Sequence, residues 1–233
     1  MGKKVIIIIG AILLVDQLIK IWVKNNMGAF ETVPVLDGFF QLYYIENRGM
    51  AFGATLGGGA WAKYTLSIFR FIAIIGIALY IRKLIKENQA PKGLFIALAL
   101  IIAGAAGNLI DSLCYDLFWT LDPNLSWNLA MDSNDMFILD PDTLEPVLRP
   151  HGFLLGSVVD MFQFTTVWPS WTPEIDFLGI RPGKEIFGAI WNFADLSISI
   201  GVGLIIVRYR KFFQKAEPEN EAPATNPEAV SEV

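Results

Sequence analysis

The stretch Trp191-Asn192-Phe193-Ala194-Asp195 decides how the rest of the chain is interpreted. It brings a carboxylate into the last long apolar segment, residues 186–207, which otherwise has the composition of a membrane-spanning helix. A charged side chain in such a place costs roughly 2.5–3.5 kcal/mol on insertion scales and indicates a functional site by default. A second carboxylate lies in a similar apolar setting, in Gly156-Ser157-Val158-Val159-Asp160-Met161-Phe162. We predict that Asp160 and Asp195 meet in the folded protein.

The composition is that of a membrane protein. Of the 233 residues, 54% are hydrophobic, and the mean hydropathy is +0.47, which is too apolar for an ordinary soluble domain. The net charge of −5 comes from an acidic tail after Lys215, so the near-neutral body gives no reason to expect nucleic-acid binding. With one cysteine, Cys114, and one histidine, His151, the chain has no internal disulfide and no His-rich zinc site, and we expect no metal or cofactor. A Ser-His-Asp site would depend on His151 alone, in a loop rich in Pro and Asp.

Four apolar segments predict four transmembrane helices, at residues 5–23, 61–81, 93–113 and 186–207. Lys3-Lys4 before the first segment resembles a signal-peptide start, but the small-residue cleavage site is missing, so we expect an uncleaved helix. Basic residues follow or precede the segments at one common side, which the positive-inside rule places in the cytoplasm. Both termini are then cytoplasmic, and Asp160 and Asp195 lie toward the extracytoplasmic face.

Polar residues inside these segments are further candidates. Asp16 and Lys20 are four apart and share a helix face, so they either form an ion pair that eases insertion or support the site. Arg70 either lines the protein interior or snorkels. The small residues 103–107 allow close helix packing, but packing does not explain Asn108 and Asp111, which we place at the end of the third helix.

Outside the helices we expect a small sheet and a long insert. Aromatic and β-branched residues at 32–35 and 39–45 predict short strands, and residues 27–60 as a whole predict a sheet and mobile loop on the membrane surface. Residues 114–155 form a polar insert, residues 157–168 return to strand-like character, and residues 168–173 predict a turn. Residues 1–213 then form one domain, and residues 214–233 have the composition of a disordered cytoplasmic tail.

Two carboxylates within hydrogen-bond reach favour acid–base chemistry. They do not easily both ionise, so one keeps its proton while the other is a base. Such a pair activates water against a carbonyl group and protonates the leaving amine, which is aspartic-protease chemistry. Two alternatives remain: Asp160 and Asp195 serve separately, as a helix cap and a loop anchor, or the protein is a non-enzymatic four-helix transporter or assembly factor whose polar residues mark an ion path.

Five motifs together resemble the lipoprotein signal peptidase (signal peptidase II) family. They occur in the family's order and span residues 15–195. They are Val15-Asp16-Gln17 with Lys20, Glu46-Asn47-Arg48-Gly49-Met50-Ala51-Phe52-Gly53, Gly104-Ala105-Ala106-Gly107-Asn108-Leu109-Ile110-Asp111, the segment around Asp160, and Asn192-Phe193-Ala194-Asp195.

This resemblance implies an all-α membrane protein of four transmembrane helices, with a small extracytoplasmic sheet and an extended extracytoplasmic insert. It implies an intramembrane aspartic endopeptidase of the bacterial inner membrane, which removes signal peptides from prolipoproteins just before a diacylglyceryl-modified cysteine. The implied catalytic acids are Asp160 and Asp195. We expect membrane lipid and prolipoproteins as partners and a monomeric enzyme. The implied supporting residues are Asp16, Lys20, Asn47, Gly104, Asn108, Asp111 and Asn192.

The chain departs from the family pattern at two places. Ser112 stands where the family usually has an arginine after Asn-Leu-Ile-Asp, so the role of that arginine is either absent or supplied elsewhere. The insert 114–155 replaces a connection that is usually short. Because it lies on the predicted active-site side, we interpret it as an accessory lid or a substrate-selective surface.

Overall fold

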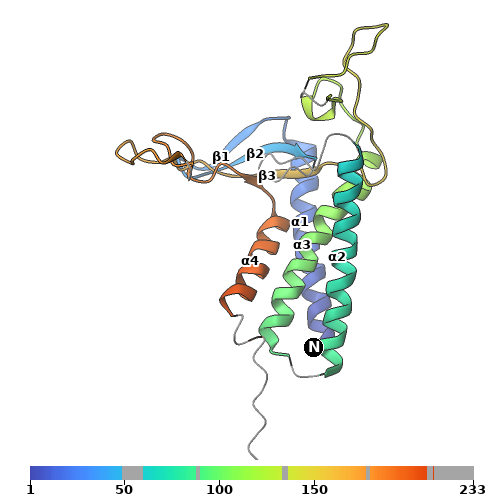
Figure 1. The fold of residues 1–233 in the computed structure, drawn as a ribbon, viewed down its shortest axis with the longest axis vertical. Coiled ribbons are helices and arrows are strands. Elements are labelled where there is room, and N and C mark those ends of the chain that lie inside the picture. Colours follow the sequence, from blue (N-terminus) through green and yellow to red (C-terminus); the bar gives the residue numbers. More distant parts are fainter. Residues whose placement is uncertain (49–59, 88–89, 133–135, 177–178, 209–211, 213–233) are drawn as a thin grey trace, which may run out of the picture.

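A computed structural model describes residues 1–48, 60–87, 90–132, 136–176, 179–208 and 212. Four helices stand side by side, and a small antiparallel sheet lies across one end of them (Figure 1). Parts of two predictions lie outside the described residues: the loop after residue 48, with Gly49 to Gly53 of the second motif, and the tail 214–233.

Within the described residues, three helices are long and apolar enough to cross a membrane: α1 (Gly2–Asn26), α2 (Ala60–Glu87) and α3 (Lys92–Phe118). The predicted helices at 5–23, 61–81 and 93–113 are therefore present, but α2 and α3 run further than expected. Helix α2 continues to Glu87 because Leu84 is buried in the bundle and Lys83 pairs with Glu87 one turn later.

Helix α3 continues to Phe118, so the predicted insert begins inside it and the prediction that it starts at residue 114 is wrong. Tyr115 is buried beside Val23 and Met27 at the end of α1, and this contact stabilises the extra turn. Asn108 and Asp111 consequently lie well inside α3, and not at its end as the sequence suggested.

The fourth helix is shorter than predicted. Helix α4 covers Phe193–Val207, which is 15 residues, or about 22 Å at 1.5 Å per residue. The residues expected to begin it make other contacts: strand β4 (Ile190–Trp191) pairs with β3 (Val158–Phe164), and Ile186 donates its backbone N–H to the Thr166 carbonyl. Helix α4 therefore begins at Phe193, seven residues after the predicted start.

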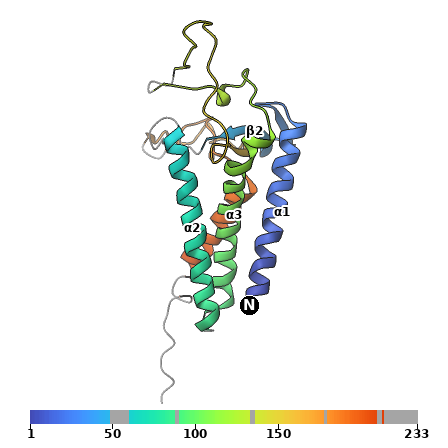
Figure 2. The ribbon, with the colours of Figure 1, turned by 90° about the vertical axis from the view of Figure 1, so that its right-hand side faces the viewer.

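Helix α3 is the centre of the bundle and packs against α1, α2 and α4, as Figure 2 also shows from the side. Its contact with α4 is close because glycines line it. A Cβ atom added at Gly104 would lie 2.2 Å from the Ala194 carbonyl oxygen, and one at Gly201 would lie 2.7 Å from the Ala97 carbonyl oxygen. The predicted small-residue packing is therefore present in α3.

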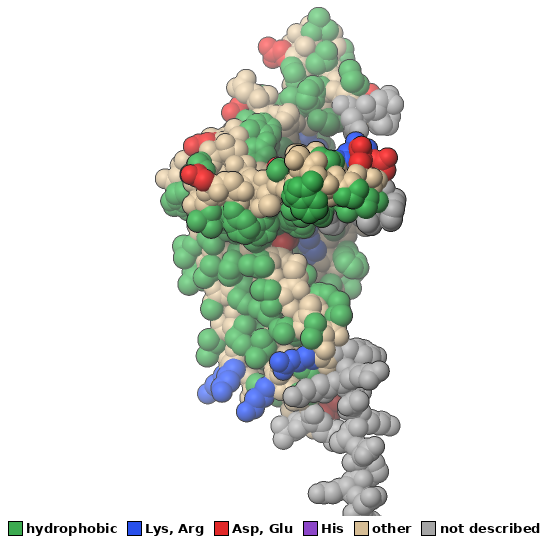
Figure 3. All heavy atoms as spheres, turned by 90° about the vertical axis from the view of Figure 1, so that its left-hand side faces the viewer, with side chains coloured by type: hydrophobic (Ala, Val, Ile, Leu, Met, Phe, Trp, Pro, Cys, Tyr) green, Lys and Arg blue, Asp and Glu red, His purple; other side chains and the backbone are tan. Residues whose placement is uncertain are grey.

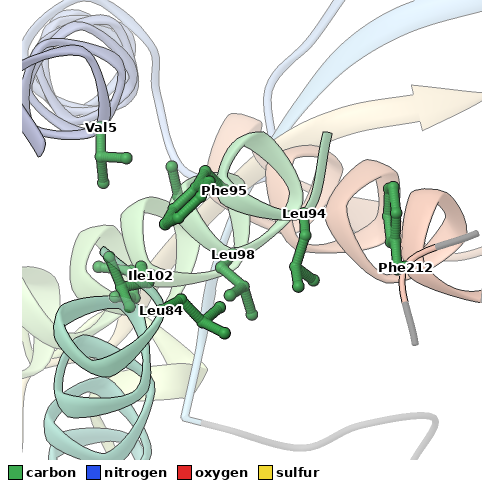
Figure 4. Close-up of a cluster of buried hydrophobic side chains, with 9 residues drawn as sticks. Val5, Leu84, Leu94, Phe95, Leu98, Ile102 and Phe212 are labelled. Atoms are coloured by element: carbon green, nitrogen blue, oxygen red, sulfur yellow. The ribbon is translucent and has the colours of Figure 1, made fainter. Parts of the chain in front are cut away.

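An apolar cluster holds the opposite end of the bundle together. Leu94, Phe95, Leu98 and Ile102 of α3 contact Val5 of α1 and Leu84 of α2, and Phe212 closes the cluster beside Leu94 (Figure 4). Buried charged side chains such as Lys20, Asp111 and Asp160 lie away from this cluster, toward the sheet end.

The sheet has strand order β1-β2-β3-β4, with all pairs antiparallel. The strands are β1 (Thr32–Leu36), β2 (Phe40–Asn47), β3 (Val158–Phe164) and β4. The strand predictions at 32–35 and 39–45 are confirmed within two residues, whereas β3 ends four residues before the end of the predicted stretch 157–168. The register between β2 and β3 shifts between Leu42 and Ile45, opposite Phe162 and Asp160. Such a bulge re-aims side chains locally, and this one lies next to a predicted catalytic residue.

Two extensions leave the sheet. Residues 165–176 and 179–187 form two paired segments, in which the Trp168 N–H donates to the Lys184 carbonyl, and they reach sideways beyond α4 (Figure 1). The predicted turn at 168–173 is confirmed within the first of them, with Thr172 donating to the Pro169 carbonyl. The insert forms a second arm, paired at Leu129–Leu148 and Leu139–Pro146, which projects away from the helices.

Charge is distributed unevenly along the bundle. Blue basic side chains gather at the end of the helices opposite the sheet, a green apolar surface covers the helices, and acidic side chains lie mainly above it (Figure 3). The basic residues at that end of the first three helices are Lys3, Lys4, Arg82, Lys83, Lys86 and Lys92.

Candidate active site

Asp195 lies in the first turn of α4. The helix is capped by Asn192, whose side-chain oxygen accepts the backbone N–H of Asp195 at 2.9 Å. The carboxyl group of Asp195 is therefore not the cap, and its Oδ1 accepts a hydrogen bond from Asn108 Nδ2 at 2.8 Å. The alternative in which this acid serves only as a helix cap does not describe the structure.

Asp160 lies in the middle of β3 and is 1% exposed. It is paired with Ile45 of β2, and Asn47 is paired with Val158, so Asn47 is the diagonal neighbour of Asp160 on the same sheet face. The Asn47 side chain is hydrogen-bonded to the Asp160 carboxyl group. The neighbouring residues Val159 and Met161 face the other way, into a cluster with Tyr44 and Tyr115.

Two asparagines bridge the two acids. Asn192 Nδ2 donates to Asp160 Oδ1 at 2.6 Å and to Asn108 Oδ1 at 3.2 Å. Asn108 in turn donates to Asp195. The chain Asp160–Asn192–Asn108–Asp195 thus brings together residues from β3, the cap of α4, and α3, which are far apart in sequence.

A buried lysine lies beneath this bridge. Lys20 Nζ is 3.0 Å from Asp16 Oδ2, 2.8 Å from Asp111 Oδ2 and 2.9 Å from Asn108 Oδ1. All three charged side chains are at most 1% exposed. The ion pair predicted from the four-residue spacing of Asp16 and Lys20 is confirmed, and Asp111 is a second partner, so the ammonium group satisfies all three of its donors.

The two acids that pair with Lys20 also hold the backbone beside the candidate catalytic residues. Asp16 Oδ1 accepts the N–H of Ala194 at 2.9 Å, one residue before Asp195. Asp111 Oδ2 accepts the N–H of Val159 at 3.4 Å, one residue before Asp160. One ion cluster therefore fixes both segments, which explains how a strand and a helix end can present two carboxyl groups to one place.

The two carboxyl groups have different environments. Burial and, after it, the neighbouring charge of Asp195 raise the pKa of Asp160 to about 7, against the lowering effect of the amide hydrogen bonds and of Lys20. Asp195 is half-buried and thus the more accessible of the two to water. The arrangement supplies one carboxyl group that holds a proton near neutral pH and a second one beside it.

Comparison with known proteins decides the family. The sequence model of the family described as signal peptidase (SPase) II matches residues 8–211. The chain belongs to the signal peptidase II family. A relative named lipoprotein signal peptidase from Porphyromonas gingivalis is 37% identical over 219 residues, covering 89% of this chain and 83% of the relative. Another of the same name, from Amoebophilus asiaticus, is 32% identical, covering 95% of this chain and 85% of the relative.

The fold is shared with a solved structure described as a bacterial membrane enzyme, determined by the in meso method at 2.3 Å resolution. The TM-score is 0.57 and the identity 22%, covering 93% of this chain and 94% of that one. This signal peptidase II family member is thus a protease with a membrane-enzyme fold.

Two positions singled out in the sequence have packing roles in this family member. Gly104 lies against the Ala194 carbonyl, where no side chain fits. Ser112 is fully buried, its hydroxyl donates to the Asn108 carbonyl at 3.2 Å, and its own carbonyl accepts the N–H of Gly156. Ser112 therefore joins α3 to the segment that enters β3, and it carries no charge into the site.

Sequence reasoning missed several residues of the site. Gln17 donates to Asp16 and to Asp111 Oδ1, and its own oxygen accepts the Tyr115 hydroxyl. Its place beside Asp16 in the first motif was the available signal. Arg149 was also missed: it is 1% exposed and makes two 2.8 Å hydrogen bonds to Asp116, which fix the insert to the end of α3. In the part of the chain that the structure describes, no group of three or more His, Cys, Asp or Glu residues could hold a metal ion.

Proposed function

We propose that Asp160 and Asp195 are the catalytic pair of an intramembrane aspartic endopeptidase, which removes signal peptides from bacterial prolipoproteins. The observation that carries this assignment is the asparagine bridge, in which Asn192 and Asn108 bond to each other while each holds one acid. The reaction is inferred from membership of the family, and the catalytic residues are inferred from the asparagine bridge.

The substrate is a prolipoprotein, in keeping with the name that the relatives carry. The cleaved bond lies just before a cysteine that already bears a diacylglyceryl group, as the motif resemblance implies. Val35 and Leu36 of β1 and Phe39 in the turn that follows expose apolar side chains, and a lipid-anchored peptide would be held between this sheet and the helix ends.

The reaction needs one water molecule and the two acids. The Asp195 carboxylate takes a proton from the water, and the resulting hydroxide attacks the carbonyl carbon of the scissile peptide bond. Protonated Asp160 donates a hydrogen bond to the carbonyl oxygen, whose developing charge it stabilises. The proton held by Asp195 then passes to the amide nitrogen, the C–N bond breaks, and the products are a carboxyl-ended signal peptide and a lipoprotein with a free amino group.

The membrane arrangement is part of the proposal. Helices α1, α2 and α3 cross the bilayer, and α4 is the fourth span, begun below the sheet where Asn192 caps it. The basic end of the bundle is cytoplasmic by the positive-inside rule, so both termini are cytoplasmic and the acids lie toward the extracytoplasmic face. Residues 1–213 form one peptidase domain, active as a monomer.

The insert is proposed as a substrate-selective surface. Its arm carries exposed Met136, Phe137 and Leu144, and the Arg149–Asp116 pair fixes its base. Because the arm projects away from the helices, this position favours contact with the mature part of a substrate over closure of the site.

Replacing either acid tests the assignment. In the Asp160→Asn and Asp195→Asn variants we expect cleavage of a prolipoprotein in membranes to fall by at least about 10³-fold, since each acid has its own step. The exposed Glu87→Gln change, at the end of α2 far from the acids, is the control and should leave cleavage unchanged. Retained cleavage in either site variant would exclude this pair, and a transporter or assembly factor would show no cleavage in the wild type.

A further inference from the structure

The upper half of α2 buries a polar face. Lys63, Ser67 and Arg70 are spaced by four and three residues and so lie on one side of the helix. Lys63 is 3% exposed and Ser67 is fully buried, and Arg70 is half-buried. Further along the same helix the buried residues are apolar, Ile81 and Leu84. Arg70 thus lines the protein interior and does not snorkel, which were the two roles predicted from the sequence.

The two cations on this face have free donors. Among the described residues, neither Lys63 Nζ nor Arg70 Nη1 has a hydrogen-bond partner, although both atoms are buried. Residues 49–59, which precede α2, contain no Asp or Glu. Buried donors of this kind cost free energy unless an acceptor binds to them. The buried ammonium group of Lys20, in contrast, has three partners within the protein.

The face is directed at the catalytic acids. Ser67 Oγ donates to the Leu154 carbonyl at 3.1 Å, which joins α2 to the segment that leads into β3 six residues before Asp160. The Arg70 guanidinium lies close enough to Asp195 and Asp160 for their charges to interact. Lys63 lies nearer the sheet end of α2, within electrostatic range of Asp111 and Asp116.

We propose that Lys63 and Arg70 bind carbonyl oxygens of the substrate, from the side opposite the two acids. Carbonyl oxygens form strong hydrogen bonds with charged donors in a water-poor site, and the substrate supplies them in its extended peptide backbone and in the esters of its acyl chains. This inference rests on the proposed function, because it assumes that the substrate lies between α2 and the acids.

The spacing of the two cations suits such a ligand. Seven helical residues separate Lys63 from Arg70, a rise of about 10 Å. An extended peptide advances about 3.3 Å per residue, so this distance covers about three residues. Arg70 then contacts the carbonyl group at the cleaved bond, and Lys63 contacts a carbonyl group roughly three residues away or an ester of the lipid.

Binding of an uncleaved substrate tests the proposal. The full-length protein carrying Asp160→Asn is purified in detergent, and its affinity is measured for a fluorescent peptide that spans the cleavage site and bears diacylglyceryl-cysteine. Adding Lys63→Met or Arg70→Gln should weaken binding roughly 10- to 100-fold, since each removes a charged donor. Lys86→Met and Arg82→Gln, the same changes at the far end of α2, should leave the affinity unchanged.

A second peptide distinguishes the two sources of carbonyl oxygen. In it, the acyl esters are replaced by ether-linked alkyl chains of the same length. If the Lys63→Met effect persists with the ether peptide, its ligand is the peptide backbone. If the effect disappears, its ligand is the ester. Either result supports a carbonyl-binding role.

The active enzyme gives the complementary readout. Lys63→Met should raise KM with kcat within about twofold, because binding remote from the reacting bond is lost, while Lys63→Arg, which keeps the donor, should restore KM. Melting temperature measured in detergent identifies a variant that has merely failed to fold. Unchanged affinity for both peptides in folded Lys63→Met and Arg70→Gln would overturn the inference. If Asp160→Asn itself cleaves, the proposed function fails first.

Discussion

At Asp160, burial and hydrogen bonding act on one carboxyl group in opposite directions. Burial favours the neutral form, whereas the amide groups of Asn47 and Asn192 and the charge of Lys20 favour the ionised form. Burial prevails, and the pKa of Asp160 rises from 3.8 to about 7. The residue pattern alone predicted that two acids share one proton, but it could not say which keeps it, because that depends on the half-buried position of Asp195.

The raised pKa makes a prediction about stability. Between pH 3.8 and about 7 the carboxyl group ionises in the unfolded chain but not in the native protein, so the free energy of unfolding falls as the pH rises. Above pH 7 the loss is complete and amounts to about 4 kcal/mol. Asp160→Asn removes this cost, so its melting temperature in detergent should exceed that of the wild type at pH 8 and approach it at pH 4.

The matched control for this measurement is Asp142→Asn, since Asp142 is exposed on the arm. It should follow the wild type at both pH values. An Asp160→Asn variant whose melting curve also follows the wild type at both pH values would show that Asp160 is ionised throughout. Asp160 could then not be the group that carries the proton in catalysis.

At the scale of elements, the contact between α3 and α4 determines where Asp195 lies. The sequence predicted close packing from the small residues 103–107, and Gly104 confirms it. It could not predict that Gly201 faces α3 while Gly203 does not, because the start of α4 at Phe193 depends on the pairing of β4 with β3. Which residues of one helix contact its neighbour depends on tertiary contacts, and the pattern of residues along a single helix does not determine it.

The two glycines of α4 provide a matched pair of variants. A Cβ at Gly201 meets the Ala97 carbonyl oxygen at 2.7 Å, whereas a Cβ at Gly203 has no atom within 4 Å. Gly201→Ala should therefore destabilise the protein by about 1–3 kcal/mol through overpacking, and Gly203→Ala should be neutral or slightly stabilising through helix propensity. Equal effects on thermal unfolding in detergent would contradict the close α3–α4 contact.

For the whole molecule, the sequence predicted the four apolar helices, the strands and the common basic end, since these follow from composition and periodicity. It did not predict the paired segments 165–176 and 179–187 or the arm of the insert, which are joined by isolated pairs such as Val167–Glu185 and Leu139–Pro146. Neither segment has a clear alternation of polar and apolar residues. The arm is held in place by a contact distant in sequence, the ion pair of Arg149 with Asp116. Contacts between residues this far apart are hard to predict from a single sequence.

The orientation in the membrane is the prediction that belongs to the whole molecule. If the basic end is cytoplasmic, Lys86 at the end of α2 and Asp142 on the arm lie on opposite sides of the membrane. We expect a membrane-impermeant maleimide added to intact spheroplasts to label Asp142→Cys and to spare Lys86→Cys, both in a Cys114→Ser background. After permeabilisation both should be labelled, which controls for accessibility. Labelling of Lys86→Cys alone in intact spheroplasts would invert the topology and place the two acids on the cytoplasmic side, where a lipoprotein signal peptide does not present its cleavage site.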